Sequence, residues 1–251
     1  MGDLYGFTYY GDLLGVGAAY NLGPEVAYRK LNAFYNTAFA RFEPLCNQLR
    51  PTIHVQMFSD SLVIWGEGPE RVLQPLQETY LDLLSKGLML RGALVSGALE
   101  KEPRMEAKGF RKFLPLNDTL ARAVGLEGTV KGARLLIESD LARKLLVNIP
   151  DWLTLEGYLA NVHPEVPEAS MLRRICPAPS GTSYELLYFW SSLNRTAENA
   201  EIGDQLKELA EFQEPGVAEH LRETAKVLRR GQLRQRRTEK LLSNQRIQRT
   251  G

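Results

Sequence analysis

Cysteine, histidine and long apolar runs are scarce in this sequence, and each scarcity excludes a class of protein. Its 251 residues include two cysteines, Cys46 and Cys176, and three histidines. Two cysteines without a Cys-x-x-Cys pair argue against a disulfide-stabilised fold and against a structural zinc site. His54, His163 and His220 lie far apart and show no metal-ligand spacing. We therefore expect a reduced, cytoplasmic protein.

Membrane spans and the common hydrolase motifs are also missing. No apolar run approaches the roughly 20 residues that a membrane-spanning helix needs, so we expect no membrane partner. The first residues lack a basic segment followed by an apolar stretch, which argues against a signal peptide. Neither a Gly-x-Ser-x-Gly motif nor a Cys/His nucleophile signature occurs. The hydrophobic content of 44% and charged content of 24% are ordinary for a globular protein.

The near-neutral net charge conceals a basic C-terminal segment. Of 31 Lys and Arg residues and 30 Asp and Glu residues, ten basic and two acidic ones lie in residues 221–251, which leaves 21 basic and 28 acidic ones in residues 1–220. This split predicts either a tail with an anionic partner, such as a nucleic acid, or a helix that lies on the acidic body or extends a dimer. No aromatic residue follows Arg222, so stacking platforms for single strands are absent. We favour the second interpretation and expect no nucleic-acid partner.

The first half of the chain alternates strand and helix patterns. In order, we expect a strand over Leu4–Val16, a helix over Pro24–Leu49, a hairpin of strands 52–58 and 62–65, a helix over Pro69–Leu84 and a strand over Met89–Leu99. The order strand-helix-strand-strand-helix-strand is the split-βαβ, ferredoxin-like arrangement. It predicts an α+β fold with an antiparallel-rich sheet and helices on one face.

The second half is less regular. We expect a charged arm over 101–114, a helix over Asn117–Glu127, a strand over 131–137, a helix over Glu138–Leu146, a Pro-rich stretch from Pro150 to Pro179, a strand over Tyr184–Trp190 and helices after residue 193. These patterns divide the chain into a core domain over 1–150, a strand and loop region over 151–192 that packs on the core, and a charged helical extension over 193–251.

Asp12 stands at the end of the first predicted strand, directly before a Gly-rich stretch. An acidic side chain is costly to leave unpaired there. Gly15 and Gly17 would let backbone N–H groups approach an anion at the mouth of the following helix. An Asp in such a place also commonly caps a turn or a helix, so Asp12 alone does not identify a site.

Asp60 lies in the predicted hairpin turn, between Ser59 and Ser61. Such turns are common without any function, because Asp and Ser hydrogen-bond their own backbone. In the split-βαβ order, however, the first strand and the hairpin are neighbours, so Asp12 and Asp60 would lie side by side. Two carboxylates suit Mg²⁺ or Mn²⁺. Two ions held in this way can activate a hydroxyl and neutralise a triphosphate.

The order and spacing of these stretches resemble the class III nucleotidyl cyclases. YYGDLLGV (residues 9–16) is similar to their F-x-D-I-x-G-F stretch, and MFSDSLVIW (residues 57–65) to the hairpin that carries their second carboxylate. LRGALVSG (residues 90–97) is similar to the strand that follows, and TLARAVGLE (residues 119–127) to the late helix. The resemblance covers residues 5–140 and makes residues 1–150 the catalytic domain.

The resemblance implies an activity and its residues. Asp12 and Asp60 would be the catalytic metal ligands for two Mn²⁺ or Mg²⁺ ions, and Leu13 would add a backbone carbonyl. The family also implies a homodimer with sites at the subunit interface. The resemblance and the closeness of other residues to the two acids also predict contacts with the nucleotide. We expect these contacts from Tyr10, Leu14, Gly15, Val16, Gly17, Gln56, Phe58 and Arg91.

Three departures from the family pattern bear on the substrate. Purine-specific members carry Asn and Arg on the late helix, where this chain has Ala121 and Gly125, and a Lys that reads adenine, where it has Gln56. In this the chain resembles the bacterial antiphage pyrimidine cyclases of the Pycsar system, which make cyclic UMP or cyclic CMP for a separate effector. The resemblance therefore implies a UTP or CTP cyclase.

Several alternatives stay open at this point. Arg91 could contact phosphate or pair with an acid. Lys108, Arg111 and Lys112 in the arm could reach a triphosphate across a dimer or remain solvated. A cyclase-like regulator that binds nucleotide or nucleic acid without turnover would also tolerate the departures. A palm-domain polymerase or cyclic-dinucleotide synthase is disfavoured, because such enzymes usually place two acids side by side in the hairpin, where this chain has Ser59-Asp60-Ser61.

Overall fold

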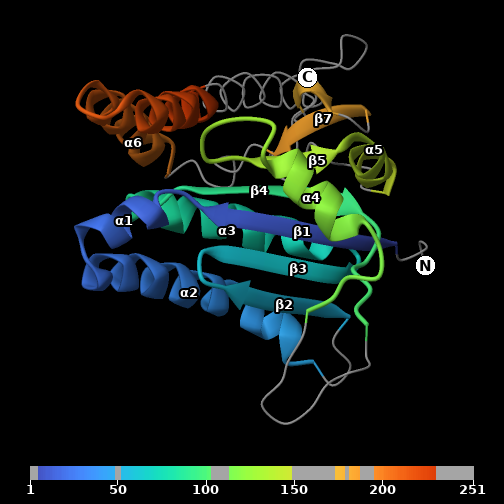
Figure 1. Cartoon of the computed structure of the whole chain (residues 1–251). Helices are drawn as coiled ribbons and strands as arrows, with labels where there is room; N and C mark the ends of the chain where they lie inside the picture. Colours follow the sequence, from blue (N-terminus) through green and yellow to red (C-terminus); the bar gives the residue numbers. More distant parts are fainter. Residues whose placement is uncertain are drawn as a thin grey trace, which may run out of the picture.

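A computed structural model describes residues 5–48, 52–102, 113–148, 173–178, 181–186 and 195–229. A mixed sheet crosses the molecule, with helices packed against it and further helices near its upper edge (Figure 1). This is the predicted α+β architecture. The charged-arm residues Lys108, Arg111 and Lys112 lie outside the described residues.

The elements of the first half follow the predicted order. They are β1 (Gly6–Leu13), α1 (Val16–Leu22), α2 (Pro24–Cys46), β2 (Ile53–Phe58), β3 (Ser61–Glu67), α3 (Glu70–Ser85) and β4 (Leu90–Ser96). The first strand ends at Leu13, before the predicted end at Val16, because Gly15 adopts a left-handed conformation, φ 79°, and α1 begins directly after it. α2 begins at Pro24, whose fixed φ suits a first helical position.

The later elements are α4 (Thr119–Glu127), β5 (Leu135–Glu138), α5 (Ser139–Asn148), β6 (Arg173–Ala178), β7 (Gly181–Leu186) and α6 (Arg195–Glu211). The predicted strand over 131–137 is four residues later at its start, because the chain turns at Gly132 with φ 89°. Residues 187–190 of the predicted strand Tyr184–Trp190 lie outside the described residues. β6 was not predicted, since Pro177 obscures its pattern.

The described strands have the order β2-β3-β1-β4-β5-β7-β6, and among these described strands β4 and β5 are the one parallel pair. β1 therefore lies in the interior of the sheet, antiparallel to β3 on one side and to β4 on the other. The predicted neighbourhood of the first strand and the hairpin is confirmed. β6 and β7 extend the sheet past β5, while the proposed boundaries at 150 and 192 fall outside the described residues and stay predictions.

The helices do not all lie on one face, which refines the prediction. The largest apolar cluster joins one face of the sheet to α2, α3 and α5, with Phe34, Leu76 and Leu141 among its buried members. On the other face α4 packs Ala123 and Leu126 against residues of β4 and β5. The pattern over residues 119–127 predicted a helix but not the face of the sheet that it covers. That face depends on the segments that connect the helix to its neighbouring strands.

The C-terminal extension is partly built into the core. Residues 195–211 and 215–229 are helical, as predicted, and residues 230–251 lie outside the described residues. The second of these helices places Leu221, Ala225 and Leu228 in the main apolar cluster. In the part of the chain that the structure describes, no helix has the length and apolarity to cross a membrane.

Candidate active site

β1 brings Asp12 to the hairpin turn that carries Asp60. Asp12 lies opposite Ser61 of β3 and opposite Arg91 of β4. The next backbone N–H, that of Leu13, donates a 2.8 Å hydrogen bond to the carbonyl oxygen of Asp60. The three residues predicted from the resemblance to hold metal therefore lie together at one end of the sheet.

The turn itself is held from the helix layer. Ser59 adopts φ 49°, which is rare for a residue with a side chain. The side chain of Tyr35, on α2, hydrogen-bonds with the backbone of Ser59. Burial raises the pKa of Tyr35, and the neighbouring Asp60 carboxylate adds to this rise. Tyr35 was missed from the sequence, because its helical spacing indicated only a core position.

Asp12 is partly buried and has two acidic neighbours. Its pKa is raised to about 6, first by burial and then by the charges of Asp60 and Glu127. The guanidinium of Arg91 and a hydrogen bond with Ser61 oppose this rise. A divalent cation would relieve the same repulsion, so the charge pattern fits a metal ion at Asp12 and Asp60.

Carboxylates supply only part of a coordination sphere here. Searched over the described residues, the chain holds no cluster of three or more His, Cys, Asp or Glu side chains suited to a metal ion. Mg²⁺ commonly takes one or two carboxylates and completes its shell with water and substrate phosphate oxygens. The residues present therefore fit a cation that is shared with a phosphorylated substrate.

The register places the other expected contacts on the face that carries Asp12. Tyr10 lies two residues before Asp12, and its hydroxyl lies 3.1 Å from Oγ of Ser61. Gln56 pairs with Val63, which pairs in turn with Tyr10, so Gln56 shares this face from two strands away. Ser61 thus contacts both Tyr10 and Asp12, a role that its place in a turn did not reveal.

Phe58 also points to the face of Asp12, because it pairs with Ser61. Its side chain is 43% exposed and packs edge-on against Phe113 at 5.5 Å between ring centroids. An exposed aromatic ring beside two carboxylates offers a flat apolar surface to a base.

The Gly-rich segment forms the turn between β1 and α1. The N–H of Leu14 is used in a 2.8 Å bond to the Met89 carbonyl, whereas Gly15 and Gly17 are exposed. Gly15 is the N-cap of α1 without any side-chain cap, and Val16 turns its side chain into the core. The ammonium of Lys30 lies 3.9 Å from the position that a Cβ on Gly15 would take. Lys30 is a cation beside this turn that the sequence pattern did not single out.

Arg91 adopts the second of the two roles considered for it. Its guanidinium forms a close ion pair with Glu127, the last residue of α4, and Nη1 lies 3.4 Å from the carbonyl of Val130. Burial raises the pKa of Glu127, which the neighbouring guanidinium opposes. Arg91 remains near enough to Asp12 to lower its pKa.

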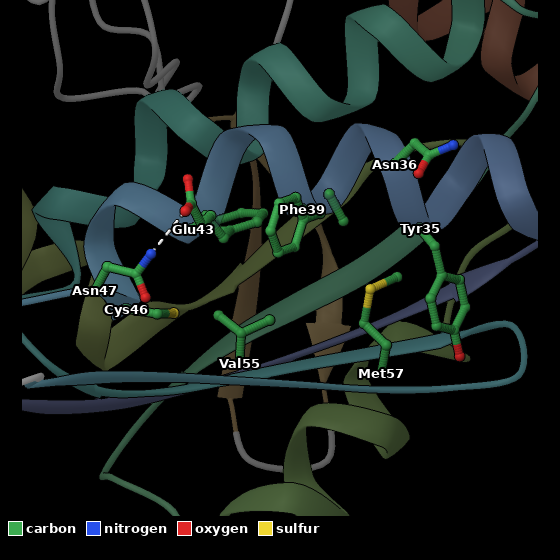
Figure 2. Close-up of a pocket in the computed structure, with 10 residues that line it drawn as sticks. Tyr35, Asn36, Phe39, Glu43, Cys46, Asn47, Val55 and Met57 are labelled. Carbon is green, nitrogen blue, oxygen red and sulfur yellow. Dashed lines mark hydrogen bonds between the residues drawn. The ribbon is translucent and has the colours of Figure 1, made fainter.

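A separate hollow of about 440 Å³ lies between α2 and β2 (Figure 2). Its lining is mainly apolar, with Phe39 from α2 facing Val55 and Met57 from the edge strand. Asp12 and Asp60 do not line it. Tyr35 is the one residue named above that borders both the hollow and the Ser59–Asp60 turn.

Solved structures of other proteins share this fold, although their sequences differ strongly from this one. No protein-family model and no curated protein sequence matches the chain. Among solved structures, the dimeric guanylyl cyclase domain of a fusion protein from the fungus Blastocladiella emersonii aligns with a TM-score of 0.51, 11% identity, and coverage of 74% of this chain and 96% of that one. A Trypanosoma brucei adenylate cyclase aligns with a TM-score of 0.50, 12% identity, and coverage of 73% and 88%. The chain has the fold of these cyclase domains.

Proposed function

We propose that the protein is a nucleotide cyclase that converts a nucleoside triphosphate to a 3′,5′-cyclic nucleotide and pyrophosphate. The observation that carries the proposal is that the Leu13–Asp60 backbone bond joins the end of β1 to the hairpin turn, where the charge of Asp60 contributes to the raised pKa of Asp12. The cyclase-domain fold supports it, because similar domains are named as guanylyl and adenylate cyclases.

Two divalent cations, Mn²⁺ or Mg²⁺, would supply charge neutralisation at the phosphates and would acidify the ribose 3′-hydroxyl. Asp12, Asp60 and the Leu13 carbonyl would hold them. The turn of Leu14, Gly15, Val16 and Gly17, in which both glycines are exposed, would position the triphosphate with Lys30 beside it. The site then acts mainly by orientation and by stabilising charge as the 3′-oxygen attacks the α-phosphorus and pyrophosphate leaves.

The finer proposal is that the substrate is UTP or CTP. Gln56 stands where purine-specific cyclases carry a lysine that reads adenine. On α4, Ala121 and Gly125 are exposed and offer no side chain that could hold a ribose or a developing charge. These differences favour a pyrimidine base, which the exposed ring of Phe58 could stack upon.

The resemblance to the pyrimidine cyclases also suggests the oligomeric state, the location and the biological role of the protein. We propose a cytoplasmic homodimer in which a second copy completes each site, and a cyclic UMP or cyclic CMP product that acts on a separate effector in antiphage defence. Neither a membrane nor a nucleic acid is needed as a partner. Sedimentation of the purified protein, with and without nucleotide, would show whether it dimerises.

Turnover assays test the proposal directly. Purified protein is incubated with Mn²⁺ and each of the four nucleoside triphosphates, and the products are identified by mass. We expect cyclic UMP or cyclic CMP from the wild type and none from Asp12→Asn or Asp60→Asn. Absence of any cyclic product would refute the proposal, and cyclic AMP or cyclic GMP would refute only its pyrimidine part.

The missing side chains on α4 also favour a second candidate, a cyclase-like regulator that binds nucleotide without turnover. A Cβ on Gly125 would meet nothing within 4 Å, so that helix face is open rather than occupied by another group. Asp60→Ala separates the two candidates. It should abolish turnover in a cyclase, whereas a regulator has no turnover to lose and should bind nucleotide as tightly as the wild type.

A further inference from the structure

Arg91 and Asp12 are direct cross-strand partners in the interior of the sheet. The β1–β4 register places them opposite each other, on the face that α4 covers. Opposed residues in an antiparallel pair have Cβ atoms about 5 Å apart, well within the reach of a guanidinium. An arginine so close to a half-buried carboxylate would ordinarily form a two-pronged ion pair with it.

The structure shows a different pairing. The guanidinium turns to Glu127, and no ion pair joins it to Asp12, although both residues lie in the described part of the chain. The side chains of Arg91 and Glu127 are 15% and 6% exposed, so the pair is largely removed from water. The Val130 carbonyl accepts a further contact at 3.4 Å and directs the guanidinium toward the end of α4.

This arrangement has a consequence for metal binding. A carboxylate that is bound two-pronged by arginine has its lone pairs occupied and competes poorly for a cation. With Arg91 held by Glu127, the side-chain hydrogen bond of Asp12 is made with Ser61 and not with the guanidinium. The positive charge nevertheless stays close enough to limit the repulsion between Asp12 and Asp60.

We propose that Glu127 is a positioning residue that keeps Asp12 open for a divalent cation by holding the guanidinium of Arg91 away from it. The inference rests on the metal site of the proposed function. It adds a third carboxylate whose task is to bind an arginine and not the metal. The link also makes metal affinity depend on how α4 packs against the sheet.

The test measures Mn²⁺ binding without nucleotide, by the paramagnetic resonance signal of free Mn²⁺ or by calorimetry. Glu127→Gln retains the size of the side chain and removes its charge, so Arg91 is released to pair with Asp12. We expect Mn²⁺ affinity to fall about tenfold, as is usual when a residue behind a metal ligand is changed. The double variant Glu127→Gln/Arg91→Met should return to within about twofold of the Arg91→Met variant.

A matched control lies at the other end of the same helix. Arg122 of α4 forms an ion pair with the nearly buried Glu138 of β5. Glu138 also accepts a 2.9 Å bond from the N–H of Ser96, which is the β4 partner of Phe7, five residues before Asp12. Glu138→Gln should lower the melting temperature much as Glu127→Gln does and leave Mn²⁺ affinity unchanged.

The outcomes distinguish a failure of this inference about Glu127 from a failure of the proposed metal site. Loss of binding in Asp12→Asn with full binding in Glu127→Gln would overturn this inference and leave the metal site standing. Weak binding in the double variant would also overturn it, because a purely structural role of Glu127 is not rescued by removing Arg91. Equal binding by the wild type and Asp12→Asn would overturn the metal site, and this inference with it.

Discussion

Tyr35 on α2 hydrogen-bonds with the backbone of Ser59, one residue before the proposed metal ligand Asp60. Ser59 holds a left-handed conformation that is unfavourable for a residue with a side chain, so the turn depends on such external contacts. The helix layer thereby contacts the turn that carries Asp60. The first prediction follows from this contact.

Tyr35→Phe should weaken Mn²⁺ binding and turnover without unfolding the protein. Loss of one hydrogen bond that orders the turn corresponds to roughly a three- to tenfold change. Tyr28→Phe is the control, because Tyr28 lies two helical turns earlier on α2 and is 67% exposed. Both variants should be compared by Mn²⁺ titration and by initial rates. Equal effects of the two substitutions would show that the Tyr35 hydroxyl has no role at the turn.

Mn²⁺ affinity should rise as the pH increases through about 6. Burial and the neighbouring negative charges raise the pKa of Asp12 to this value. A proton competes with the metal ion below this pH, so apparent affinity falls as Asp12 becomes protonated. Titrations of the wild type at pH 5, 6, 7 and 8 would measure the dependence. A flat profile would mean that Asp12 does not ligate the ion.

The same raised pKa predicts an effect on the metal-free fold. Between the unfolded value of 3.8 and the folded value of about 6, the folded protein holds a proton that the unfolded chain has released. Stability of the metal-free protein therefore falls as pH rises through this window, and the loss is complete above it. Asp12→Asn should raise the melting temperature at pH 8 without metal and make this part of the pH dependence disappear.

Lys30→Ala should raise the KM for the nucleoside triphosphate about tenfold, because a charge-assisted contact to phosphate is lost beside Gly15. Mn²⁺ binding without nucleotide should not change, since Lys30 is not a proposed metal ligand. Arg29→Ala removes an exposed neighbouring charge and serves as the control. A change in Mn²⁺ affinity with unchanged KM would contradict this role for Lys30.

Substitution by alanine should have opposite effects at Gly132, which contacts the C-terminal helix, and at Gly125, which is exposed on α4. A Cβ on Gly132, where φ is 89°, would lie 2.8 Å from the backbone nitrogen of Thr224. Gly132→Ala should therefore lower the free energy of unfolding by about 2–3 kcal/mol. Gly125→Ala, in the exposed face of α4, should raise it by about 0.5–1 kcal/mol. Urea unfolding at pH 7 would measure both.

The sequence determined the elements that have strong periodic signals. The aromatic first strand, the hairpin around Ser59 and Asp60, and α2 with its Pro24 start are local patterns, since each depends on residues that are close in the chain. Their order was enough to predict that β1 and the hairpin pair, which brings Asp12 and Asp60 together. The short strand β6 and the move of α4 to the opposite face were not predictable in this way.

Only the tertiary structure decided what surrounds the two aspartates. Tyr35, Lys30 and Glu127 reach the site from α2 and α4, and their helical spacing carries no information about which strand end they meet. The pairing of Arg91 with Glu127, 36 residues further along the chain, depends on where α4 ends over the sheet. Side-chain pairing between distant segments is set by packing of whole elements, whereas the position of each element in the order is set by its own residues.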